Sequence, residues 1–143
     1  MSGGWRRKMC ALFQDERGSQ MLEFVLVFPL VWLLIVFAFD QFSILYNKQK
    51  ALAAAYEAGR IAAVQPNYGL AKYHARERGE EELKAGLGVA DHDVRIELAD
   101  GRWKKGNHLR AEATLSFYLL ATGQKFELTE SYYMMIENAE EKK

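Results

Sequence analysis

The chain has 143 residues, and its 19 basic residues balance its 19 acidic residues, so the formal net charge is zero. This length suits one small domain with an anchor, and the balanced charge gives no sign of a nucleic-acid partner. Half of the residues are hydrophobic, and many of these are gathered in one N-terminal run.

Residues 1–18 are basic and polar. Their charged residues are Arg6, Arg7, Lys8 and Arg17 on the basic side and Asp15 and Glu16 on the acidic side. Basic residues beside a transmembrane segment tend to stay in the cytoplasm. We therefore expect the N-terminus to be cytoplasmic and the C-terminal region to lie on the other side of the membrane.

An almost unbroken apolar run follows, over residues 24–39, with no charge between Glu23 and Asp40. With the two apolar residues before Glu23, it reaches roughly the ~20 residues that cross a hydrocarbon core. The apolar part of a secretory signal is shorter and ends at a small-residue cleavage site, whereas here a helical pattern continues past Asp40. The run therefore predicts a retained membrane anchor over about residues 21–39.

Two residues, one directly before this run and one within it, are unusual. Glu23 stands at its start, where a carboxylate is costly unless it has a partner or lies solvated at the headgroup level. Pro29 removes one backbone donor and crowds the carbonyl of Val25, which predicts a kink in the helix. The kink is either harmless or a point at which the helix bends during packing.

From Asp40 to Val64 the pattern stays helical and rich in alanine, which has the highest helix propensity. The large apolar residues here are Phe42, Leu45, Tyr46, Leu52 and Tyr56, and their spacing forms a one-sided stripe. A stop signal follows at Gln65-Pro66-Asn67. We predict one long helix over residues 19–65 and expect a globular region to cover its apolar face outside the membrane.

Residues 66–143 are expected to form an α+β region. The stretch from Tyr68 to Leu87 is highly charged and predicts a solvated helix or a loop with helical turns, limited in length by Gly79, Gly86 and Gly88. After Val89 the hydrophobic period changes to two, which is typical of strands.

Three strands are predicted from this alternation, with turn signals at Asp100-Gly101 and Thr122-Gly123 between them. The alternating stretches are Val94–Leu98, Leu109–Phe117 and Phe126–Ile136. One face of such a meander is apolar, and the amphipathic half of the long helix is its natural cover. The predicted fold class is therefore α+β, with a long N-terminal transmembrane helix packed on a small antiparallel β-sheet.

Residues typical of catalytic or metal sites do not converge in the sequence. His74, His92 and His108 are scattered, and Asp91-His92-Asp93 would need further ligands to hold a metal ion. Lys104-Lys105 reads as a solvated hairpin tip. We therefore expect no enzyme activity, no metal and no cofactor.

The N-terminal pattern resembles the processing site of the type IV prepilin superfamily. Gly18 follows a basic stretch, and Glu23 is the fifth residue after it, at the mouth of the apolar run. In that superfamily an inner-membrane peptidase cuts after the glycine, and the fifth mature residue is a glutamate. The resemblance implies that residues 1–18 are a leader and that cleavage exposes Ser19. It also implies that Glu23 neutralises the new amino group on a neighbouring subunit.

A second pattern is similar to the signature of TadE-like proteins. In that family a Glu-Phe-apolar-Pro segment, here Glu23 to Pro29, precedes an Ala-rich helix containing Glu-Gly-Ala-Arg. This chain has Glu57-Ala58-Gly59-Arg60, with Gly and Ala in the opposite order. From the residues alone, Glu57 and Arg60 are three apart and can pair, and Gly59 permits close approach by a strand or another helix.

The resemblance implies a minor pseudopilin that takes part in assembly of a tight-adherence (Flp-type) pilus, a machine of cell adhesion and biofilm formation. The implied partners are a prepilin peptidase, other pilins or pseudopilins, the inner-membrane assembly platform and the lipid bilayer. The implied location is the bacterial inner membrane, crossed once, with residues 66–143 in the periplasm, and also the pilus itself.

Two other functions are compatible with the sequence. A signal-anchored envelope binding protein unrelated to pili would not be cleaved and would give Glu23 no role. A membrane-tethered enzyme or metal-binding domain would need a cleft with convergent ligands.

Overall fold

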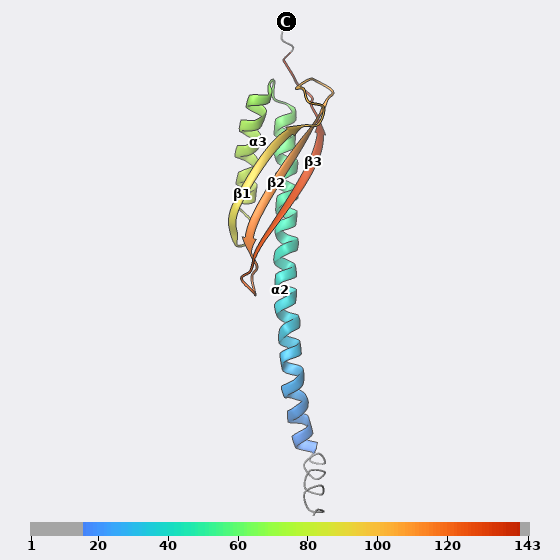
Figure 1. The fold of residues 1–143 in the computed structure, drawn as a ribbon, viewed down its shortest axis with the longest axis vertical. Coiled ribbons are helices and arrows are strands. Elements are labelled where there is room, and N and C mark those ends of the chain that lie inside the picture. The colour runs from blue at the N-terminus through green and yellow to red at the C-terminus, as the bar shows by residue number, and fades with distance from the viewer. Residues whose placement is uncertain (1–15, 141–143) are drawn as a thin grey trace, which may run out of the picture. The chain divides into compact units, whose positions relative to one another are not determined.

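The computed structural model describes residues 16–140, with side chains described from Gln20 onward. Within this range the element order is α2 (Glu16–Ala63), α3 (Tyr68–Leu83), β1 (Val89–Leu98), β2 (His108–Tyr118) and β3 (Lys125–Met135) (Figure 1). The predicted α+β fold, a long apolar N-terminal helix and a small antiparallel sheet, is confirmed. The proposed leader, residues 1–18, lies outside the described residues except for its last three.

The chain divides into two compact units, Met1–Ala38 and Phe39–Lys143. Helix α2 begins in the first unit and ends in the second, and it continues through Pro29 as one helix. It starts three residues before the expected position and ends at Ala63, three residues before Pro66. The sequence stop signal therefore marks the end of the helix correctly.

The sheet has the strand order β1-β2-β3, and both pairs are antiparallel. Val94 pairs with Ala113, and Ala113 pairs in turn with Glu130 on β3. The two predicted turns are present, with Gly101 and Gly123 at positive φ. This backbone conformation costs glycine little and other residues much.

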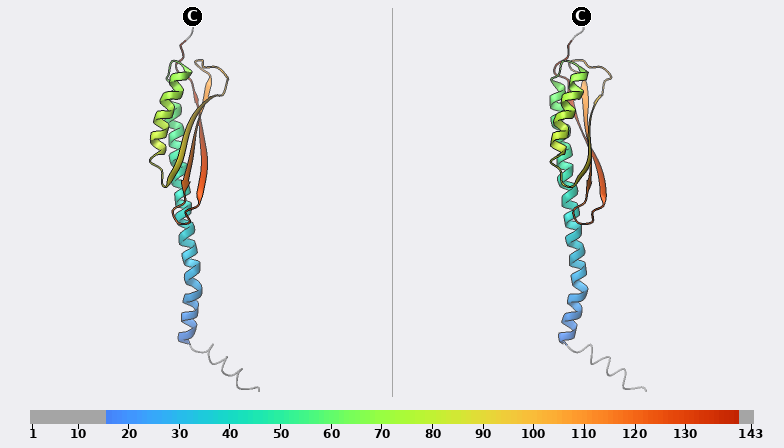
Figure 2. Two further views of the ribbon diagram at one scale, coloured as in Figure 1. Left: turned by 60° about the vertical axis from the view of Figure 1, so that its left-hand side comes forward. Right: turned by 90° about the vertical axis from the view of Figure 1, so that its left-hand side faces the viewer.

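Both helices lie on the same side of the sheet in the second unit (Figure 2). Each helix comes close to the sheet at a buried glycine. A Cβ added at Gly79 of α3 would lie 2.9 Å from both Cγ atoms of Val94 on β1. A Cβ added at Gly59 of α2 would lie 3.3 Å from the Cβ of Ala111 on β2 and 3.4 Å from the Sδ of Met134 on β3. Helix α3 thus packs on β1, and α2 packs on β2 and the adjacent part of β3.

The role predicted for Gly79 is wrong. It does not limit the second helix, since α3 runs through it to Leu83. The absence of a side chain lets the helix approach β1, and the packing offsets the ~1 kcal/mol by which glycine disfavours a helix relative to alanine. The start of α3 is fixed by Asn67, whose Oδ1 accepts a hydrogen bond from the backbone N–H of Leu70 at 3.0 Å.

The face of α2 that covers the sheet is also not the expected one. The predicted cover was the stripe of large side chains, but Phe42, Leu45, Leu52 and Tyr56 are all exposed. The buried side chains of the helix are mostly alanines, namely Ala51, Ala54, Ala55, Ala58, Ala62 and Ala63. They face small residues of β2 such as Ala111 and Ala113, which are themselves completely buried. Small side chains on both elements allow the backbones to come close, and large ones would hold them apart.

Candidate functional site

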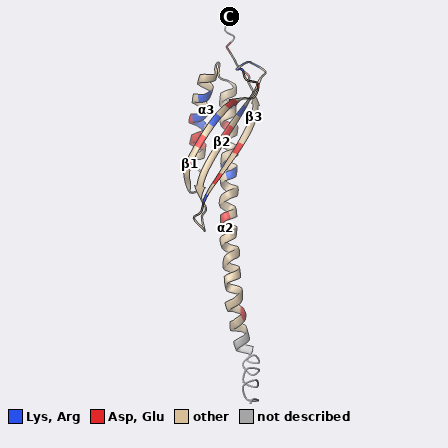
Figure 3. Cartoon of the chain, in the orientation of Figure 1, with Lys and Arg blue, Asp and Glu red and all other residues tan. Residues whose placement is uncertain are grey.

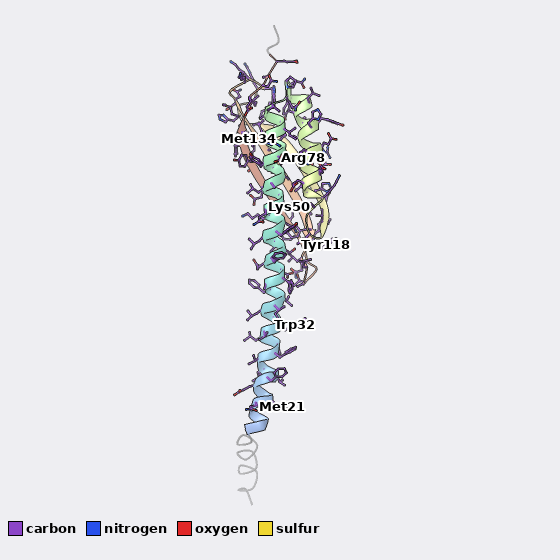
Figure 4. The ribbon with its side chains drawn as sticks, turned by 180° about the vertical axis from the view of Figure 1, so that it is seen from behind. Met21, Trp32, Lys50, Arg78, Tyr118 and Met134 are labelled. Carbon is purple, nitrogen blue, oxygen red and sulfur yellow. The ribbon has the colours of Figure 1, made fainter. Side chains whose placement is uncertain are left out.

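The first candidate feature is the apolar part of α2. From Gln20 to Phe39 nearly every side chain is exposed, including Phe24, Phe28 and Trp32. This helix is long and apolar enough to cross a membrane, judged by length and composition. Figure 3 shows acidic residues at both ends of an uncharged stretch, and Figure 4 shows Met21 and Trp32 pointing away from the helix axis. So large an exposed apolar surface requires lipid or protein around it.

Gly18 and Ser19 lie in the first turn of α2, and Glu23 lies one turn further on. Ser19 and Glu23 are four residues apart and therefore share a helix face. The side chain of Glu23 is exposed and forms no hydrogen bond or ion pair within the part of the chain that the structure describes.

Pro29 lies within α2, nine residues after Gln20, the first residue whose side chain the structure describes. Proline has no backbone N–H, so the carbonyl of Val25, four residues earlier, lacks its usual helical donor. The helix nevertheless continues on both sides of Pro29.

The predicted Glu57–Arg60 pair is present. A guanidinium nitrogen of Arg60 donates to Oε2 of Glu57 at 2.8 Å, and the hydrogen bond raises the pKa of Arg60 above its ordinary value. The pair is largely exposed, and such surface pairs contribute little to stability. Gly59 is buried between them, where it permits the close approach of β2 and β3 described above.

A buried carboxylate that the sequence analysis did not assign lies next to the apolar run. Asp40 is 7% exposed, and its Oδ1 accepts hydrogen bonds from the backbone N–H groups of Ala121 and Thr122 at 2.9 and 3.3 Å. Its Oδ2 accepts from the Thr122 hydroxyl at 2.8 Å. Burial alone would raise the pKa of Asp40, but these three hydrogen bonds outweigh it, so the pKa is lowered. Asp40 therefore fastens the helix to the β2–β3 turn as a charged group.

Two turns further along the same face, Asn47 fastens a second loop. Its Nδ2 donates to the carbonyl of Leu87 at 2.9 Å, and its Oδ1 accepts from the N–H of Leu87 at 2.8 Å. Gly86 leaves room for this contact, because a Cβ there would lie 2.9 Å from Oδ1 of Asn47. The α3–β1 loop is thus held to α2 through both polar groups of one residue.

The sequence gives only a weak indication that Asp40 and Asn47 are buried. Asp40 and Asn47 are seven residues apart and continue the face formed by Ala51, Ala54 and Ala58, so they read as polar members of the buried alanine face. Ser43, between them, is also fully buried, and its hydroxyl has no partner within the described residues. A helix face made of alanines and short polar side chains marks the sheet-facing side better than large hydrophobic residues do.

The outer face of the sheet carries the charged residues of the strands. A depression of about 370 Å³ is lined by ten side chains, namely Asp91, His92, Asp93, Arg95, Glu97, Glu112, Thr114, Ser116, Glu127 and Thr129. Several of these pair with one another, for example Arg95 with Asp93 at 2.6 Å and Ser116 with Glu127 at 2.9 Å. Among residues 16–140, no group of three or more His, Cys, Asp or Glu is placed to hold a metal ion.

Comparison with known families identifies one match. Residues 18–60 match the model of the family described as TadE-like protein. No curated protein and no solved structure matches the chain. The matched segment begins at Gly18, contains Glu23 and Pro29, and ends at Arg60. The resemblance noted in the sequence is therefore confirmed over residues 18–60, where the chain is similar to TadE-like proteins.

Proposed function

We propose that this chain is a minor pseudopilin of a tight-adherence (Flp-type) pilus, with a structural rather than a catalytic role. The observation that carries the proposal is the TadE-like match over residues 18–60. The match begins at Gly18, directly after the basic stretch, and includes Glu23 and the uncharged apolar part of α2. In the type IV prepilin superfamily this order of residues serves processing and assembly of the pilus.

In this proposal the apolar part of α2 anchors the chain in the inner membrane. The basic residues Arg6, Arg7, Lys8 and Arg17 keep the N-terminus in the cytoplasm. Asp40 is the first charged residue after the apolar run, and its hydrogen bonds to the β2–β3 turn tie the folded region to the point where the run ends. Residues 66–143 then lie in the periplasm, next to the assembly platform and to other pilins.

Cleavage between Gly18 and Ser19 by a prepilin peptidase would give the mature subunit. It removes the basic leader and leaves an α-amino group at Ser19, one turn before Glu23. A carboxylate at the start of an apolar helix is costly unless it is paired. We propose that the Ser19 amino group of an adjacent subunit pairs with Glu23 during assembly, and that the missing helical donor at Pro29 lets α2 bend as it packs.

The experiment that tests this function compares the mature N-terminus in cells with and without the prepilin peptidase. Gly18→Leu should leave a precursor that retains its first 18 residues, and Gly4→Leu, a change at another glycine of the leader, should be processed normally. N-terminal sequencing and intact mass of the membrane-extracted protein distinguish the two forms. Protein of the same length with and without the peptidase would remove the main support for the pilus role. It would favour an uncleaved, signal-anchored envelope protein.

A further inference from the structure

The two helices leave the third strand of the sheet partly uncovered. Helix α3 contacts β1 at Val94, and α2 contacts β2 at Ala111. On the same face of β3, Phe126 and Tyr132 are still about two-fifths exposed. The sheet therefore has a helix over its first strand and another over its second, but no equivalent helix over its third within residues 16–140.

Side chains of α2 reach this uncovered strand at two points. The rings of Tyr56 and Tyr132 meet edge to face, with 5.2 Å between centroids, and Lys48 pairs with Glu130 at 3.6 Å. Together the two elements form one continuous surface, which we call the α2–β3 face. Its members are Phe42, Leu45, Leu52, Tyr56, Phe126 and Tyr132, all of them more than one-third exposed.

The spacing on α2 fits a helix as the occupant of this face. Phe42, Leu45, Gln49, Leu52 and Tyr56 follow one another at intervals of three, four, three and four residues. This is the heptad spacing by which one helix packs along another, and a single polar residue in such a stripe specifies register. In a parallel, in-register pair the two copies of Gln49 lie opposite each other and can hydrogen-bond.

The face is also suited to a second copy of itself. Its nearest charges, Lys48 and Glu130, compensate each other within each copy. Six half-exposed side chains of this size offer on the order of 500 Å² of apolar surface per copy. Burial on both copies would approach the ~1,000 Å² expected of a specific interface. An isologous contact of this kind closes on itself as a dimer.

We propose that the α2–β3 face is a dimer interface, in which α2 of a second copy lies parallel to α2 and covers the uncovered part of β3. The parallel orientation rests on the membrane anchor of the proposed function, because two copies anchored in one membrane have the same orientation. It requires neither cleavage nor a pilus. The interface can therefore be tested in membranes that contain this protein alone.

The test uses full-length protein in which the single native cysteine is replaced, Cys10→Ser. Leu52→Cys is added at the centre of the face, and Leu70→Cys on α3 is the matched control, because Leu52 and Leu70 are 43% and 42% exposed. In a parallel two-fold pair residue 52 meets its own copy, within the short Cα–Cα distance that a disulfide needs. Mild oxidation of membranes should therefore give about tenfold more disulfide-linked dimer for Leu52→Cys than for Leu70→Cys.

A second pair of variants measures the free protein without cross-linking. Leu52→Arg should convert the detergent-solubilised dimer to monomer in light scattering after gel filtration, and Leu70→Arg should leave it dimeric. The proposal is overturned by equal cross-linking at both positions, by no dimer at either, or by a Leu52→Cys product whose mass shows a different protein. Each result is read in cells without the prepilin peptidase, so a failure of the dimer and a failure of the pilus role are separate outcomes.

Discussion

Asp40 on helix α2 and Thr122 in the β2–β3 turn are joined by two hydrogen bonds to one carboxylate, although 82 residues separate them in the chain. The side chain of Thr122 binds Oδ2 and its backbone N–H binds Oδ1. Because an ionised carboxylate accepts both bonds, the contact depends on charge. Protonation of Asp40 in acid should therefore weaken this contact and lower the stability of the folded region.

We expect the thermal stability of the full-length protein in detergent to fall in acid partly through Asp40. Its pKa is lower in the folded state than the ~3.9 of an unfolded chain. The stabilising contribution is therefore complete above about pH 4 and is lost as the pH falls through the folded-state pKa. Asp40→Asn should have a lower melting temperature than wild type at pH 7, and the difference should shrink as the pH falls below the unfolded-state value of ~3.9. A difference independent of pH over this range would contradict the role given to the charge.

Asn47→Ala should destabilise the folded region by about 2–4 kcal/mol, because it leaves the N–H and the carbonyl of Leu87 without their partner in a partly buried site. Denaturant unfolding of the full-length protein in detergent, followed by circular dichroism, measures this change. Gln41→Ala, at an exposed position of the same helix, serves as the control and should change stability by less than about 0.5 kcal/mol. Similar effects from both variants would mean that Leu87 finds another partner.

Gly79→Ala and Gly69→Ala should change stability in opposite directions, although both glycines lie in α3. Each substitution gains up to about 1 kcal/mol of helix propensity. At Gly69 the new Cβ meets only Oδ1 of Asn67 at 3.4 Å, whereas at Gly79 it meets both Cγ atoms of Val94 at 2.9 Å. Overpacking typically costs about 1–3 kcal/mol, so Gly79→Ala should be net destabilising. A higher melting temperature for Gly79→Ala would show that α3 can move away from β1.

Glu23→Gln tests the proposed pairing with the Ser19 amino group. The substitution keeps the shape of the side chain and removes its charge, so cleavage and membrane insertion should persist while piliation is impaired. Filaments counted by electron microscopy, together with a blot for the mature protein, measure both effects. Glu81→Gln, an exposed glutamate on α3, is the control and should leave filaments normal. Abundant filaments from a strain whose only copy carries Glu23→Gln would rule out the pairing.

Much of the fold follows from local periodicity. The alternation of Val94, Ile96 and Leu98 with charged residues predicted β1, and all three are buried or half-buried. Gly59 was correctly read as a point of close approach, because a glycine in an alanine-rich helix has few other uses. These predictions succeeded because each depends on residues that are neighbours in the sequence.

The parts that the sequence did not disclose depend on distant partners. The partners of Asp40 and Asn47 lie about 80 and 40 residues away, so nothing local distinguishes these side chains from solvated ones. The orientation of α2 was mispredicted because Phe42 and Leu52 have more apolar surface to bury than any alanine. The orientation of α2 instead follows from close packing of its backbone on its neighbours. This packing is visible only in the contacts of Ala58 with Gly79 of α3 and of Gly59 with Ala111 of β2.

The end of helix α2 is completed by the last described residues of the chain. The backbone N–H groups of Glu137 and Asn138 donate to the carbonyl of Ala63 at 2.9 and 3.2 Å, and the N–H of Glu140 donates to the carbonyl of Pro66 at 2.8 Å. During synthesis, α2 leaves the ribosome more than 70 residues before the segment that closes it. The C-terminal end of the helix therefore lacks these hydrogen-bond partners until that segment has been made. Since long-range contacts of this kind form late and slowly, a chain that stalls before residue 137 would leave an inserted helix whose C-terminal end is open to other proteins.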